Sequence, residues 1–170
     1  YLAVRSGQEN CFRILSFFDT VQGQKRAFPE QDWPATRFSI PIHQIFEGAP
    51  ALLNRSSDDT GPVLHRFGDT DRPSASLMFA PVLSGGNVIA VISLQSYTPY
   101  RYGHTELKVL QRVADIVAPA LERARAEEAL RESEARFRAI FDASAIGIGF
   151  ADRYGRLLMS NRVLQEMLGY

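Results

Sequence analysis

Residues 76–124 read SLMFAPVLSGGNVIAVISLQSYTPYRYGHTELKVLQRVADIVAPALERA, and this stretch decides the fold. Its first half belongs to a run from Pro73 to Tyr100 in which none of 28 positions is charged, and a membrane span needs only about 20 mainly apolar residues. The turn sequence Ser84-Gly85-Gly86-Asn87 argues against a span, because it divides the run into two segments of strand length, Leu77 to Leu83 and Val88 to Leu94. We therefore expect a β-hairpin and no membrane span in this chain.

A long helix is expected directly after the hairpin. Gly103 is placed to cap its first turn, with Glu106 at the third helical position. Pro119 removes one backbone hydrogen bond, but the apolar period continues past it, so we expect one kinked helix from about His104 to near Phe141. The apolar residues at spacings of three and four are Leu107, Leu110, Val113, Ile116, Val117, Ala120 and Leu121.

The expected helix becomes highly charged after residue 121. Ten residues from Glu122 to Arg138 are charged, five acidic and five basic, which is typical of a solvated helix. Leu130 and Phe137 leave a narrow apolar seam, too small for a domain core but suited to a second copy of the chain, so we expect a homodimer through this exit helix. The acidic-first pairs four positions apart are Glu127/Arg131, Glu132/Arg136 and Glu134/Arg138.

The N-terminal 73 residues carry weaker patterns. Aromatic and branched residues predict strands at Tyr1 to Val4 and Cys11 to Phe18. With the hairpin, these runs predict one antiparallel sheet and an α+β fold, in which Val88 to Leu94 is central and covered on both faces. The remaining segments are expected as a loop from Asp19 to Arg37, a strand edge at Ser39 to Pro41, a short or broken helix from His43 to Leu53, and an irregular stretch from Asn54 to Pro73.

A second, smaller pattern occupies residues 142–170. Ile146 to Phe150 and Leu157 to Met159 flank an Asp152-to-Gly155 turn, which predicts another hairpin, and Asn161 is placed to cap a helix from Arg162 to Leu168. Two short strands and one short helix bury too little apolar surface to offset their conformational entropy. We expect this segment not to be independently stable, with its apolar side chains partly exposed.

Composition limits the function. The chain has 170 residues, 45% of them hydrophobic, which suits one globular domain plus part of another. Nineteen Lys and Arg balance nineteen Asp and Glu, which disfavours nucleic-acid binding. The single Cys11 closes no internal disulfide and indicates a reducing, cytoplasmic compartment. Without an initiator Met or a signal peptide, the chain looks like an excised piece.

Residues 76–124 resemble the C-terminal half of a GAF domain, with its hairpin, aromatic-Gly helix start and exit helix. Residues 1–75 fit that family more loosely: YLAV and CFRILSFFDT look like its first two strands, and ATRFSIPIHQIFEGAPALLN like its third strand and following short helix, while the family's leading helix is missing. The signatures of two functional branches are absent, namely the several cysteines of the sulfoxide reductases and the N-K-x-n-F-x-x-x-D-E motif of the cyclic-nucleotide binders.

Residues 129–170 resemble the opening of a PAS domain, with its acidic-aromatic entry helix, D-x-x-G turn and N-x-x-x-x-x-x-L-G-Y helix. The combined resemblance implies a GAF domain at 1–121, a connecting signalling helix at 122–138 and the N-terminal part of a PAS domain at 139–170. This order is that of bacterial sensor proteins, commonly histidine kinases or cyclic-di-GMP synthases. It implies signal input and relay through the helix, with no catalysis by this chain.

Candidate chemistry is sparse. None of the three histidines, His43, His65 and His104, lies in a recognised nucleophile motif, so we expect no enzyme site. A cation site at His65 and its neighbouring aspartates, and a reactive Cys11, are weaker interpretations than a solvated acidic loop and a buried, inert thiol. The sequence names no cofactor. Aromatic residues on or beside the expected strands are candidates for a small-molecule pocket, although such residues also simply fill a core: Phe17, Phe38, Phe46 and Phe79.

Three functions stay open from the sequence. The first is a sensory module that binds a small ligand or relays a change through the exit helix. The second is a purely structural dimerisation module without a ligand. The third, least favoured, is a small enzyme of the GAF type.

Overall fold

The computed structural model describes residues 1–5, 11–21, 23–34, 42–56 and 73–170. These residues divide into two units, Tyr1–Leu121 and Glu122–Tyr170. The expected strand edge at Ser39 to Pro41 and most of the expected irregular stretch after residue 54 lie outside the described residues.

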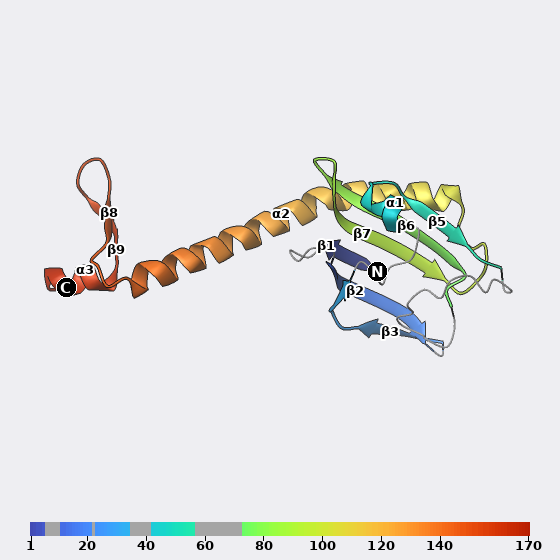
Figure 1. The fold of residues 1–170 in the computed structure, drawn as a ribbon, viewed down its shortest axis with the longest axis horizontal. Helices are drawn as coiled ribbons and strands as arrows, with labels where there is room; N and C mark the ends of the chain where they lie inside the picture. Colours follow the sequence, from blue (N-terminus) through green and yellow to red (C-terminus); the bar gives the residue numbers. More distant parts are fainter. Residues whose placement is uncertain (6–10, 22, 35–41, 57–72) are drawn as a thin grey trace. The chain divides into compact units, whose positions relative to one another are not determined.

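One antiparallel sheet forms the frame of the first unit (Figure 1). Its order is β3-β2-β1-β7-β6-β5, and β4 also pairs with β2. The expected α+β class with an antiparallel sheet is confirmed. The strands are β1 (Leu2–Arg5), β2 (Cys11–Val21), β3 (Gln24–Phe28), β4 (Gln31–Pro34), β5 (Ala51–Asn54), β6 (Ser76–Ser84) and β7 (Asn87–Ser96).

One expectation for the N-terminal half is wrong and another is only partly right. The segment predicted as a loop from Asp19 to Arg37 contains the end of β2 and the strands β3 and β4. The short or broken helix predicted from His43 to Leu53 is present as a helix of five residues, α1 (Ile42–Phe46), but the second half of that segment enters β5, which pairs with β6. In both places pairing with a neighbouring strand decides the backbone conformation, and local periodicity does not reveal such a partner.

Strand β7 is central, as predicted, with β1 on one side and β6 on the other. Its hairpin with β6 closes through Gly85 and Gly86, whose φ angles of 54° and 82° suit a two-residue turn that requires positive φ at both positions. The prediction that both faces of β7 are covered is only partly right, because Leu94, near the end of the strand, is 46% exposed.

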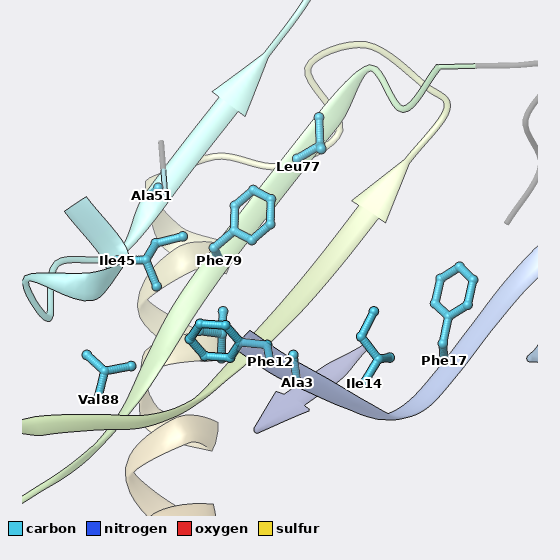
Figure 2. Close-up of a cluster of buried hydrophobic side chains, with 10 residues drawn as sticks. Ala3, Phe12, Ile14, Phe17, Ile45, Ala51, Leu77, Phe79 and Val88 are labelled. Carbon is cyan, nitrogen blue, oxygen red and sulfur yellow. The ribbon is translucent and has the colours of Figure 1, made fainter. Parts of the chain in front are cut away.

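The two faces of the sheet carry separate hydrophobic clusters. One face packs against helix α2 (His104–Ala143) through Leu107, Leu110, Ala114 and Ala118. Figure 2 shows the cluster of the other face, where Ile45 of α1 lies over strand side chains. Adjacent residues of β7 belong to different clusters: Ala90 packs in the cluster on the α2 face, and Val91 packs in the cluster on the α1 face. The central hairpin therefore connects both layers.

Helix α2 runs without interruption from His104 to Ala143, with Pro119 inside it, so the expected single helix is confirmed. The expected cap is also present: the Glu106 carboxylate accepts a hydrogen bond from the Gly103 N–H at 2.8 Å, and the Gly103 carbonyl accepts one from the Leu107 N–H. No helix in the part of the chain that the structure describes combines the length and hydropathy needed to cross a membrane.

The second unit contains the predicted hairpin, β8 (Gly149–Ala151) with β9 (Leu157–Ser160), and the predicted helix α3 (Arg162–Leu168). Its strands are exposed along almost their whole length. The expected exposure of apolar side chains is confirmed, with exposed fractions of 73% for Ile146 and 56% for Leu157.

Candidate functional site

A small cavity lies between α1 and the sheet of the first unit. Its volume is about 10 Å³, close to the lower limit for one water molecule. Ile45 and Phe46 of α1 cover it, and Figure 2 shows Ile45 beside Phe79 and Phe12. The wall is apolar throughout, and the strands supply Ala3, Phe12, Phe79 and Val91.

Tyr1 joins this apolar cavity to a polar group of side chains. Its ring lines the cavity, and its hydroxyl forms hydrogen bonds with the side chains of Ser93 and Gln95. Burial raises the pKa of the Tyr1 hydroxyl well above its usual value, so the phenol is neutral at physiological pH. The Gln95 side chain also accepts a hydrogen bond from the Ser74 hydroxyl at 2.9 Å and donates one to the Ser93 hydroxyl at 3.4 Å.

This polar group is deeply placed. The fully buried Ser93 hydroxyl bonds the Tyr1 hydroxyl and the Gln95 side-chain amide, and the Ser93 carbonyl accepts a hydrogen bond from the Tyr1 N-terminal ammonium at 2.7 Å. Burial lowers the pKa of that ammonium, because desolvation disfavours its charged form. Just after the end of β7, the Tyr97 hydroxyl lies 2.9 and 2.7 Å from the two carboxylate oxygens of Asp19.

The four aromatic residues expected at a pocket separate in the structure. Phe46 and Phe79 line the cavity. Phe17 belongs to the same hydrophobic cluster but packs elsewhere, with its ring 4.9 Å from that of Phe28 and 6.2 Å from that of Tyr1. Phe38 lies outside the described residues.

Sequence reasoning missed most of the other cavity residues. Phe12 and Val91 sit on strands that were predicted, and alternation along those strands places them on the face that carries Ile14 and Ser93. Ile45 lies in the short helix expected after residue 42, and the sequence of that helix does not indicate what it packs against. The missing information was which sheet face α1 covers.

A second polar group holds the start of α2 against the other side of the sheet. The fully buried Ser76 hydroxyl donates to Asn54 Oδ1 at 2.6 Å and accepts from the Tyr102 N–H at 3.0 Å. Asn54 Nδ2 donates to the Tyr102 carbonyl at 3.1 Å. These bonds fix β5, β6 and the residue before the helix cap in one arrangement.

Of the histidines and the cysteine, His104 is the one whose side chain lies in the part of the chain that the structure describes. It is exposed at the start of α2. His43 is in α1 and Cys11 begins β2, but the side chains of both, together with all of His65 and its aspartates, lie outside what the structure describes. Within the described residues no group of three or more His, Cys, Asp or Glu side chains is placed to hold a metal ion.

The second unit is organised around Asn161, which is fully buried. Its Nδ2 donates to the carbonyls of Phe141 and Ile146 at 3.0 and 2.8 Å, and its Oδ1 accepts from the N–H groups of Ile148 and Leu164 at 2.9 and 3.0 Å. One side chain thereby connects the last turn of α2, the hairpin and the first turn of α3. The cap predicted for α3 is confirmed.

Aromatic packing adds to this connection. The Phe141 ring lies 5.4 Å from that of Phe137 and 6.0 Å from that of Phe150 on β8. Phe137, expected at an intermolecular seam, therefore also packs inside its own chain. Leu130 is 60% exposed.

A GAF domain model matches residues 4–122, which is most of the chain and nearly all of the first unit. No curated protein matches the sequence. The matched range contains the last two residues of β1, the strands β2 to β7, α1 and the part of α2 that packs on the sheet. The chain therefore belongs to the GAF domain family.

Proposed function

We propose that this chain is the sensory input and relay module of a bacterial signal-transduction protein in the cytoplasm. Its GAF core senses a small ligand or dimerises, and α2 passes the change to a PAS-type segment and on to an output domain of histidine kinase or diguanylate cyclase type. GAF domains are typically regulatory or sensory rather than catalytic, which supports this class of function.

The observation that carries the proposal is the use of both faces of β7. Val91 lines the cavity on one face, and its neighbour Ala90 packs in the cluster that holds α2 on the other. Interiors are close-packed and transmit displacement. A ligand that moves β7 would therefore change the packing of α2, and α2 extends 22 residues past Leu121.

The PAS-type assignment of the second unit is supported by its motifs. The Asp152 turn closes with Gly155 at a φ of 82°, a backbone conformation that favours glycine. Asn161 caps α3 and also holds the end of α2. We propose residues 139–170 as the N-terminal part of a PAS domain, preceded by a signalling helix at 122–138 that continues into its first turns.

Dimerisation is proposed through the exposed apolar side of α2. Val109, Ile116, Leu130 and Phe137 are spaced by seven or fourteen positions, and their exposed fractions are 58%, 77%, 60% and 42%. A sevenfold apolar repeat is the pattern by which two helices pack along a common seam. Arg123 occupies the intervening heptad position and forms an ion pair with Glu127 at 2.7 Å.

The dimer is tested by placing a charge on the seam. We expect Leu130→Asp to weaken self-association by at least about tenfold, because a carboxylate then has to be buried between two helices. Ala135→Asp is the matched control, since it puts the same charge about 140° around the helix. Sedimentation equilibrium on the chain measures both. Unchanged association of the Leu130 variant would reject this seam.

Ligand sensing is tested separately. Native mass spectrometry of the purified chain detects a retained small molecule, and hydrogen exchange with and without it reports on residues 122–143. A ligand that alters exchange in this part of α2 supports a relay. A dimer without ligand supports the second candidate, a purely structural module, and turnover of a substrate would support the enzyme interpretation.

A further inference from the structure

The start of α2 is fastened to the sheet by two polar side chains, and the inference drawn from them rests on the proposed relay. Tyr102 directly precedes Gly103, the capping residue of α2. Its N–H donates to the Ser76 hydroxyl at 3.0 Å, and its carbonyl accepts from Asn54 Nδ2 at 3.1 Å. The Ser76 hydroxyl in turn donates to Asn54 Oδ1 at 2.6 Å. We call Asn54, Ser76 and Tyr102 the latch, because together they hold the residue before the cap to β5 and β6.

Strand β5 connects the latch to α1. Four residues separate Phe46, the end of α1, from Ala51, the start of β5, and Gly48 turns the chain between them with a φ angle of 85°. Within β5, Ala51 belongs to the hydrophobic cluster on the α1 face, and Leu52 packs against the cluster on the α2 face. Asn54 is the last residue of this strand. A movement of α1 therefore has a short path to the start of α2.

The segment between β7 and α2 contains a strained residue. Tyr100 has a φ angle of 53°, a left-handed conformation that is unfavourable for a residue with a side chain. Tyr100 is 68% exposed, so burial of its ring does not offset this strain. The segment is held on both sides, by the Tyr97 hydroxyl on the Asp19 carboxylate and by Tyr102 in the latch. Such a conformation persists only while the contacts around it hold, so opening the latch would let it relax.

The burial of Ser76 determines what happens when β5 moves. Ser76 is fully buried, and its hydroxyl both donates and accepts within the latch. If Asn54 moves away with β5, this hydroxyl loses its acceptor in an interior where an unpaired polar group is costly. If Asn54 keeps its bonds, Tyr102 moves with it. In either case a movement of β5 changes the backbone directly before Gly103, where α2 begins.

We infer that Asn54 and Ser76 are positioning residues that pass a movement of α1 and β5 to the first turn of α2. The relay thereby has a polar path into α2 besides the apolar packing of β7. Any displacement of α1, whatever its cause, acts on the same three residues.

The test loosens the connection between α1 and β5 and measures the start of α2. Gly48→Ala places a Cβ at a φ angle of 85° and 3.5 Å from the Leu83 side chain, which strains this connection. Hydrogen exchange of the 170-residue chain is followed by NMR at the Tyr102 and Leu107 amides, relative to the Ala90 amide, which reports global unfolding. We expect Gly48→Ala to raise both ratios at least about threefold. No rise at Tyr102 and Leu107 would overturn the inference.

Two further variants show whether the effect passes through the latch. In an Asn54→Ala background, Gly48→Ala should leave the Tyr102 and Leu107 ratios unchanged, because the contact is already broken. Gly85→Ala is the matched control, since it introduces the same side chain at another positive φ angle, 54°, where the added Cβ has open space around it among the described residues. It should not change the ratios. A rise in the Asn54→Ala background as large as in the wild type, or an equal rise with Gly85→Ala, would overturn the inference.

Two other substitutions decide the question if Asn54→Ala does not fold. Asn54→Asp keeps the acceptor for the Ser76 hydroxyl but removes the donor to the Tyr102 carbonyl, so it should raise the Leu107 ratio at least about threefold. Tyr100→Gly removes the cost of the positive φ angle and favours the closed latch, so the Tyr102 amide should exchange about threefold more slowly. Unchanged Leu107 exchange in the first variant, or unchanged or faster Tyr102 exchange in the second, would contradict the inferred role of the latch.

The outcomes separate this inference from the proposed function. An effect of Gly48→Ala at Tyr102 and Leu107 without any change at residues 122–143 would uphold the latch and contradict the relay. A retained ligand that alters exchange at residues 122–143 equally in the wild type and in Asn54→Ala would uphold the relay and reject the latch as its path.

Discussion

Strand β7 in the first unit and the hairpin β8–β9 in the second have similarly apolar sequences but very different surroundings. Ala90 and Ser93 on β7 are fully buried between two paired strands and two hydrophobic clusters. Every residue of β8 is exposed, and β9 is its only partner among the described strands. The comparison shows that apolar composition makes a strand, whereas pairing on both edges and cover on both faces give it stability.

The largest expected effect is a difference in backbone opening between these two regions. Amides of β7 should exchange only on global unfolding, which costs about 5–15 kcal/mol in ordinary domains. Amides of β8 and β9 should exchange through local opening, whose free energy is near zero. The expected difference is therefore about 5 kcal/mol or more. Hydrogen exchange measured by NMR on the chain gives both values. Equal protection would mean that the second unit is as stable as the first.

Truncating one leucine in each unit sharpens the same comparison. Leu110 of α2 is 4% exposed and packs on the sheet, so Leu110→Ala should lower the free energy of unfolding by about 2–5 kcal/mol. Leu158 of β9 is 65% exposed, and Leu158→Ala should change the free energy of unfolding by less than about 0.5 kcal/mol. Urea unfolding followed by circular dichroism measures both. A comparable loss for the two variants would contradict the proposed difference in burial.

The part of the fold that sequence predicted is the part with a strong local pattern. The β6–β7 hairpin combines two apolar runs with a Gly-Gly turn, and α2 has both a cap and a long apolar period. Strand β3 begins with three consecutive polar residues, Gln24, Lys25 and Arg26, all of them exposed. Its own residues therefore show no alternation of apolar and polar side chains that would predict a strand. It exists because β2 is long enough to pair with β1, β4 and β3 along its length.

The candidate site was harder to predict than the fold. Phe46 and Phe79 were selected as aromatic residues near strands, yet Phe17 met the same criterion and packs against Phe28. Whether an aromatic side chain lines a cavity or fills a core depends on what covers the sheet at that position. The cover here is one turn of helix, and its docking is a tertiary contact that no local pattern encodes.

A smaller and more local effect is expected at Asn161. Asn161→Ala removes four hydrogen bonds and leaves buried carbonyl and N–H groups unpaired, so it should increase opening of β8–β9 by about 1–3 kcal/mol. Asn161→Asp keeps the two acceptor bonds but brings a carboxylate against the carbonyls of Phe141 and Ile146. Exchange of β7 should be unchanged in both variants, because the residue lies in the other unit. A lower midpoint of unfolding for the first unit would contradict this separation.

The smallest expected effect concerns acid, and it acts on one carboxylate in each unit. The Gly103 N–H, with the Glu106 N–H, lowers the pKa of the Glu106 carboxyl from 4.5, and the N–H groups of Arg156 and Tyr154, with the Arg156 guanidinium, lower that of Asp152 from 3.8. A lowered pKa in the folded state means that each group stabilises its surroundings above the unfolded value, and that this contribution is lost as pH falls through the lower, folded value.

Acid should therefore loosen each unit at its own carboxylate. The effect should be small, because Glu106 is exposed to solvent and Asp152 is only partly buried. Lowering the pH from 6 to about 3 should lower the melting temperature of the first unit less in Glu106→Gln than in the wild type, because the amide still accepts the Gly103 N–H but does not titrate. Asp152→Asn should reduce the acid sensitivity of hydrogen exchange in β8 and β9 and leave the melting temperature of the first unit unaffected. If Asp152→Asn instead changed the acid response of β7, the two units would share one cooperative unfolding transition, and the contrast between their strands would belong to a single domain.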